Sequence, residues 1–140
     1  MRPQPFLLLF VGFILVLMAA GEAEAREPEW RYATGGTVYS VAISADGEYI
    51  AVGSDDHKVY LFDKDSNTPL WSYTTGSTVW SVAMSANGEY VAAGSWDNRL
   101  YLFDKDSSTP LWSYTAGDSV YSVAISADGE FKQLKKEILG

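Results

Sequence analysis

The sequence contains no cysteine and a single histidine, His57. The absence of cysteine excludes disulfides, thiolate metal sites, a cysteine nucleophile and a lipid-modified cysteine near the N-terminus. Positive charge is also scarce, because 10 Lys and Arg residues stand against 18 Asp and Glu residues and give a net charge of −8. We therefore expect no nucleic-acid partner, since a phosphate backbone requires a basic face.

Apolar side chains are abundant: hydrophobic residues make up 47% of the 140-residue chain and aromatic residues 14%. This composition excludes a disordered chain and suffices for one domain of ordinary size. The apolar residues form one unbroken run near the N-terminus and short, regularly spaced runs through the rest. The two regions therefore call for separate interpretations.

Residues 1–25 are organised like a secretory signal peptide. Arg2 is followed by an apolar run, Phe6–Ala20, and by small residues at Ala23 and Ala25. A positive start, an apolar centre and an A-x-A end are the parts of such a signal. The run is shorter than the roughly 20 residues that a helix needs to cross a bilayer, which favours a cleaved signal over an uncleaved membrane anchor. We expect a signal helix here, and secretion or localisation in the cell envelope.

The rest of the chain is dominated by an internal repeat. Val38–Tyr73 and Val79–Tyr114 start 41 positions apart, and 26 of their 36 aligned positions are identical. A third copy starts at Val120, and its segment VYSVAISADGE matches the first copy at every position to Glu130. Self-similarity at a fixed period indicates a repeat architecture. We assign residues 26–130 to one repeat domain, with copies at 38–78, 79–119 and, in part, 120–130.

Each full copy contains four short apolar runs separated by turn residues, which is typical of strands. A glycine follows the first run in every copy, where a tight hairpin turn often needs a positive φ. Nearly continuous apolar runs indicate burial on both faces, as in stacked sheets. Four strands every ~40–45 residues is the propeller period. We predict an all-β fold of four-stranded antiparallel blades in an incomplete ring, with first-copy strands at Val38–Ile43, Tyr49–Val52, Val59–Phe62 and Leu70–Tyr73.

The repeat resembles the WD-repeat family. The segment SVAISADGEYIAVGSDDHKVYLFD follows the pattern of that family, with Phe62-Asp63 in place of its Trp-Asp dipeptide and with Asp56 and Asp97 in place of its turn aspartate. The Gly-His dipeptide of the family is replaced by TGGTV, so its usual hydrogen-bond network cannot form in the same way. The segment VYLFDKDSNTPLWSYTTG also looks like the PQQ-like repeat. Both resemblances imply a propeller, a fold that hosts many functions.

Two features point to ligand chemistry, and both have a simpler structural interpretation. Asp63, Asp65 and Asn67 resemble the start of a calcium loop, but Thr68 and Thr74 replace the glycine and glutamate that such a loop needs. A solvated turn is the preferred interpretation. The recurring tryptophans and tyrosines of the fourth strand favour packing between blades over stacking on a cofactor. No nucleophile–base pair or paired carboxylates are visible, so we expect no enzyme, no metal and no cofactor.

Among the ten positions that differ between the two full copies, three lie at one hairpin tip, and a further one, Tyr39 in the first copy, lies near the start of the first strand. Repeat proteins form binding surfaces from variable tips on a rigid framework, and an exposed tryptophan is a typical anchor. Neutral drift at a solvated tip is the alternative. The predicted binding surface consists of the differing residues Asp55, His57 and Lys58 of the first copy and Trp80, Trp96, Asn98 and Arg99 of the second.

Two and a half repeats do not close a propeller, which typically has 4–8 blades. The pattern stops after Glu130, and Phe131, Leu134 and Ile138 have helical spacing, so residues 131–140 are predicted to form a divergent, helical tail. Three interpretations follow: a truncated relative of a larger propeller, several chains that complete one ring, or an open sheet stack capped by the tail.

The leading functional hypothesis is an exported, non-catalytic scaffold that binds a protein or another ligand. Its expected partners are another protein or further copies of itself, and only the N-terminal segment is expected to contact a membrane. The alternatives are a fragment of a PQQ-like redox propeller and a remnant without activity of its own.

Overall fold

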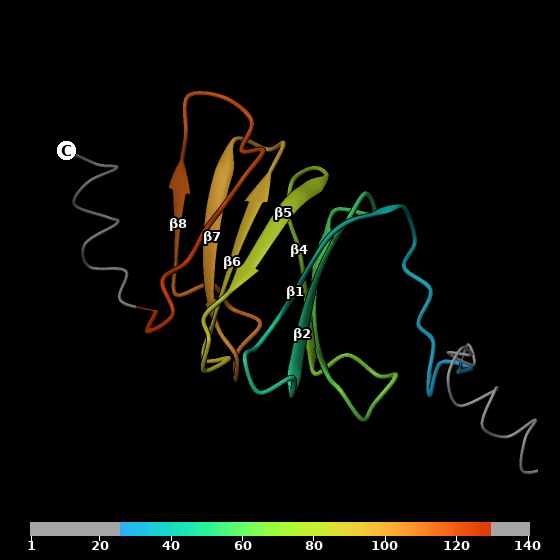
Figure 1. Cartoon of the computed structure of the whole chain (residues 1–140). Coiled ribbons are helices and arrows are strands. Elements are labelled where there is room, and N and C mark those ends of the chain that lie inside the picture. Colours follow the sequence, from blue (N-terminus) through green and yellow to red (C-terminus); the bar gives the residue numbers. More distant parts are fainter. Residues whose placement is uncertain (1–25, 130–140) are drawn as a thin grey trace, which may run out of the picture.

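The computed structural model describes residues 26–129, so the expected signal helix and C-terminal tail lie outside the described residues. This part of the chain forms two four-stranded antiparallel sheets, which we call blade 1 and blade 2, each with its strands in chain order. Figure 1 shows the two blades side by side. The all-β prediction is confirmed. The strands of blade 1 are β1 (Val38–Ile43), β2 (Tyr49–Ser54), β3 (Lys58–Asp63) and β4 (Trp71–Thr74), and those of blade 2 are β5 (Val79–Met84), β6 (Tyr90–Ser95), β7 (Arg99–Asp104) and β8 (Trp112–Thr115).

The hairpin turns use residues that tolerate a left-handed backbone. Gly47, Gly88 and Gly129 have φ angles of 75°, 74° and 69°, which confirms the predicted need for positive φ. The tips between the second and third strands of each blade carry His57 (φ 70°) and Asn98 (φ 66°) in the same region. Asparagine and histidine adopt this conformation more readily than most residues. Backbone geometry therefore restricts which residues these variable tips accept. Within residues 26–129 there is no helix long and apolar enough to span a membrane.

The blades pack through a glycine of one blade and two valines of the next. A Cβ on Gly53 in β2 would lie 2.8 Å from Val79 Cγ1 and 3.2 Å from Val82 Cγ1 in β5. The missing side chain lets β5 approach closely, so Val79 is 0% and Val82 6% exposed. Around this contact, apolar side chains of both blades form one buried cluster, which includes Leu61 and Phe103. The predicted burial is confirmed for the two blade faces that meet at this junction.

Polar contacts complete the junction between the blades. In its inner half, near β1 and β5, the Val82 amide donates to Ser40 Oγ at 3.0 Å. In its outer half, Trp71 Nε1 of β4 donates to the Lys105 carbonyl at 2.7 Å, and the Trp71 ring lies 5.1 Å from the Phe103 ring. The predicted packing role of the fourth-strand aromatics is confirmed for β4. Each blade thus presents an inner and an outer half-surface to its neighbour.

Candidate functional site

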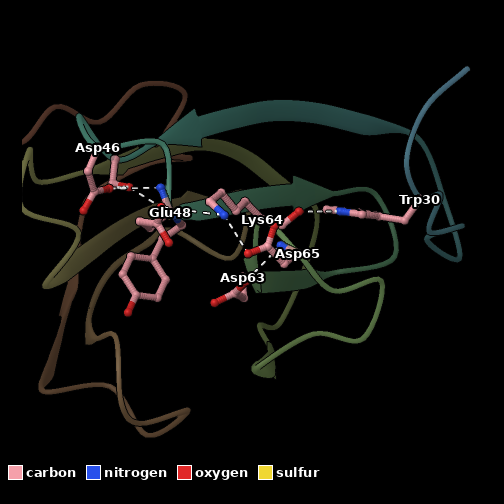
Figure 2. A network of polar contacts seen from close by, with 8 residues as sticks. Trp30, Asp46, Glu48, Asp63, Lys64 and Asp65 are labelled. Atoms are coloured by element: carbon pink, nitrogen blue, oxygen red, sulfur yellow. Dashed lines mark hydrogen bonds and ion pairs between the residues drawn. The ribbon is translucent and has the colours of Figure 1, made fainter. Parts of the chain in front are cut away.

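The segment before β1 is a further fragment of the repeat. Trp30 Nε1 donates to the Lys64 carbonyl at 2.6 Å (Figure 2). The Trp30 ring stacks 5.6 Å from the Phe62 ring. These contacts reproduce those of Trp71 in the next unit. Sequence reasoning missed this fragment, although the signal was present: Trp30 precedes Trp71 by the same 41 positions that separate the repeats. Residues 30–33 therefore cover the outer half-surface of blade 1, as β4 covers that of blade 2.

A hydrogen-bonded tyrosine–aspartate pair holds the tip of each blade. The Tyr60 hydroxyl donates to Asp56 Oδ2 at 2.5 Å, and the amides of Gly35 and Lys58 donate to the same carboxylate at 2.8 and 3.0 Å. Burial alone raises the pKa of Asp56, but these hydrogen bonds and a contact with Ser54 outweigh it and hold the pKa below 3.8. Asp56 thus ties the hairpin tip to the chain that enters the blade, and Tyr60 is its side-chain partner.

Four aromatic side chains meet at the start of the first strands and form the aromatic cluster: Tyr39, Trp80, Trp96 and Tyr121. The Trp80 ring lies 4.0 Å from Tyr39, 4.9 Å from Trp96 and 6.4 Å from Tyr121, and Trp96 lies 6.2 Å from Tyr121. Tyr39, Trp80 and Tyr121 hold the same position in three successive copies. Stacking the copies therefore turns one repeat position into a continuous row, which Trp96 joins from the tip of blade 2.

The aromatic cluster combines exposure with an unused donor. Trp96 is 42% and Tyr121 63% exposed. The Trp80 Nε1 atom is buried and has no hydrogen-bond partner within residues 26–129. A buried donor without an acceptor costs about 1–3 kcal/mol. The arrangement can offer an incoming partner aromatic area at Trp96 and Tyr121, whereas the Trp80 donor lies beneath the surface.

The structure brings together only part of the predicted binding surface. Trp80 and Trp96 join the aromatic cluster, whereas Tyr39 and Tyr121 were not predicted as members. Asp55 is engaged within the fold, because its Oδ1 accepts from Thr78 Oγ1 at 2.7 Å. No described contact links the remaining predicted residues to the aromatic cluster; they are His57, Lys58, Asn98 and Arg99, at the tips and adjoining strand starts.

The calcium-like segment forms a turn held by hydrogen bonds and ion pairs. The Asp65 amide donates to Asp63 Oδ1 at 2.8 Å, and Lys64 Nζ lies 2.6 Å from Asp65 Oδ2 and 3.7 Å from Glu48 Oε1 (Figure 2). The Asp65 carboxylate holds the pKa of Lys64 above its ordinary value. Among residues 26–129, no group of three or more His, Cys, Asp or Glu side chains is placed to hold a metal ion. These carboxylates serve the turn.

Comparison with known families agrees with this geometry. Residues 17–131 match the PQQ_2 family, which is described as outer membrane protein assembly factor BamB. The chain belongs to this family. The PQQ-like part of the sequence resemblance is thereby confirmed, and the WD-repeat part stays a prediction. No curated protein matches the chain. A PQQ-like propeller scaffold explains why the blades repeat one junction and why the fourth-strand tryptophan recurs in each unit.

Proposed function

We propose that the chain is an exported, non-catalytic propeller scaffold of the cell envelope, which binds another protein through the aromatic cluster. The family description, outer membrane protein assembly factor, supports both an envelope location and a protein partner. The proposal assigns no catalytic step and no cofactor to the blades. We therefore favour protein binding over the alternative of a PQQ-like redox propeller.

The single observation that carries this proposal is the row of aromatic side chains. Large exposed apolar patches on a soluble domain commonly mark interaction sites. Tryptophan and tyrosine dominate the binding energy of protein interfaces, because they bury large areas and offer a polar group at their edge. The exposed Trp96 ring provides the anchor, and Tyr121 adds exposed aromatic area beside it.

The two blades provide a matched variant for a test. Asp55 of blade 1 stands 41 positions before Trp96, and it accepts a hydrogen bond from Thr78. Ser119 stands at the position of Thr78 in the next unit. Trp96→Asp therefore gives blade 2 the aspartate that blade 1 carries at this tip position, with the Ser119 hydroxyl at the place of the Thr78 donor, and should preserve the fold.

The experiment places a photo-crosslinking amino acid at position 121, at the rim of the aromatic cluster, in the full chain exported by living cells. We expect a discrete adduct with a different protein of the envelope, and we expect Trp96→Asp to reduce its yield at least tenfold. Leu111→Asp is the control, because Leu111 is 53% exposed outside the aromatic cluster and should leave the yield unchanged. An adduct of equal yield in Trp96→Asp, or no adduct with any other protein, would contradict the proposal.

A further inference from the structure

The inner half of the blade junction is repeated at the far side of blade 2. There, a Cβ on Gly94 in β6 would lie 2.6 Å from Val120 Cγ1 and 3.0 Å from Val123 Cγ1. The Val123 amide donates to Ser81 Oγ at 3.2 Å. Residues 120–129 thus cover the glycine face of blade 2 in the same way as β5 covers the glycine face of blade 1.

The corresponding valines of blade 1 are uncovered. Val38 and Val41 of β1 are 44% and 54% exposed, whereas Val79 and Val82, their equivalents in β5, are 0% and 6% exposed. The described residues before β1 reach the outer half of blade 1, through Trp30, and leave these valines open to solvent. Blade 1 therefore presents two valines shaped for a glycine-bearing strand.

The chain itself contains the matching surface. Val38–Glu48 and Val120–Glu130 are identical at every position. The valines that pack against Gly94, Val120 and Val123, therefore have identical counterparts in β1 of another copy, Val38 and Val41. β1 is already paired with β2, whereas no strand is assigned within residues 116–129. Docking a strand that is already ordered loses less conformational entropy than holding an unpaired segment in place.

We propose that copies of this chain associate head to tail, with β1 of one copy docked on the Gly94 face of another in place of residues 120–129. Val38 and Val41 of the incoming copy pack against Gly94, and its Val41 amide donates to Ser81 Oγ. This contact joins two different surfaces, so it propagates until a ring closes or a filament forms. The proposal is carried by the Gly94 face and not by the aromatic cluster, in which Tyr39 of the incoming copy takes the place of Tyr121.

The contacts in the outer half of the junction are exchanged at the same time. In the chain, Tyr73 of β4 lies 5.4 Å from Tyr101 and 5.2 Å from Phe103 across the blade junction. Tyr114 of β8 stands at the position of Tyr73 and is 36% exposed. When blade 1 of a second copy docks, β8 takes over the contacts with β3 that residues 30–33 make within one chain. The two displaced segments, residues 30–33 and residues 120–129, each supply the contacts of one strand. Each is replaced by a strand of a four-stranded sheet, β8 or β1.

Sedimentation equilibrium of the full chain, in a density-matched detergent that keeps residues 1–25 in solution, tests the association. We expect the mass to rise with concentration in multiples of the 15.4 kDa chain. Val41→Asp should weaken association at least tenfold, because it places a charge on the docking face. Val123→Asp should strengthen it several-fold, because it loosens the segment that competes for Gly94.

Leu70→Asp is the matched control, since Leu70 is 51% exposed on the turn before β4 and should leave association unchanged. Circular dichroism verifies that each variant retains its β-sheet, and Gly94→Ala, expected to block docking, replaces Val123→Asp if the latter unfolds. A single-copy mass at all concentrations overturns the proposal, and so does association that Val41→Asp leaves unchanged. Val41→Asp keeps Trp96, so it should retain the envelope adduct, and the two proposals can fail separately.

Discussion

The Tyr60 hydroxyl donates to Asp56 Oδ2 at 2.5 Å, and the same pair recurs as Tyr101 and Asp97 at the same distance. Each carboxylate also accepts a hydrogen bond, 2.8 Å long, from the amide of a glycine that precedes the first strand of its blade. This glycine is Gly35 for Asp56 and Gly76 for Asp97. The pair therefore fixes the hairpin tip to the chain that enters the blade. Its recurrence makes it part of the repeat.

Tyr60→Phe should lower the free energy of unfolding by about 1–3 kcal/mol, because it removes a hydrogen bond to a charged group at a buried ring. Tyr60 is 4% exposed, so water cannot readily replace the hydroxyl. Urea denaturation followed by tryptophan fluorescence measures the change. Tyr101→Phe should have a similar effect, since its geometry is the same. A loss below about 0.5 kcal/mol in both variants would show that the pair is energetically neutral.

The low pKa of Asp56 makes the free energy of unfolding depend on pH in the acid range. The pKa in the folded state lies below 3.8, so the stabilisation is present at neutral pH and is lost as the pH falls through the folded-state pKa. Unfolding free energies measured from pH 7 downward should therefore fall steeply below about pH 4. Asp56→Asn should be less stable at pH 7 and should show a shallower acid decline. An unchanged acid profile in Asp56→Asn would exclude this carboxylate as the source.

Gly53→Ala should destabilise the chain by about 1–3 kcal/mol, because overpacking a close junction forces neighbours apart. The added Cβ would meet the Val79 side chain at 2.8 Å and its carbonyl at 3.1 Å. Gly117→Ala is the control: no atom lies within 4 Å of its Cβ position, and its φ is not positive. It should gain about 0.4–1 kcal/mol by restricting the unfolded chain. Thermal unfolding of the two variants should shift in opposite directions.

His57→Val should cost about 1–2 kcal/mol, because a β-branched residue is strained at the positive φ of this tip. His57→Asn should be nearly neutral, since Asn98 occupies the same position and conformation in blade 2. Chemical denaturation of both variants provides the comparison. Equal stability of the two would show that the tip relaxes to another conformation.

The blades and their turns could be predicted from the sequence because the determinants are local. The 41-residue period, the alternation of apolar runs with turn residues, and Gly47 and its equivalents all act through short-range backbone preferences. The strand Val38–Ile43 has the predicted bounds, and the other strands of the first copy differ from them by one or two residues. Sheet pairing extends β2 to Ser54, because antiparallel hydrogen bonds continue toward the hairpin tip.

The candidate site was only partly predictable, because its members meet through packing between units. Trp80 and Trp96 were predicted because they replace Tyr39 and Asp55 of the first copy, but that comparison did not indicate that Tyr39 and Tyr121 lie beside them. Asp55 also differed, yet its carboxylate is taken up by Thr78. Sequence differences showed where the units vary, but they carried no information about which variable residues touch.

The sequence by itself determined a repeated four-stranded blade, since strand and turn propensities act within each 41-residue unit. Only the tertiary structure decided how one unit sits on the next. Close packing of Gly53 against Val79 and Val82 sets that distance and brings equivalent side chains into rows. The aromatic cluster and the uncovered valines of β1 both follow from this stacking, because each is a property of neighbouring units rather than of any one of them.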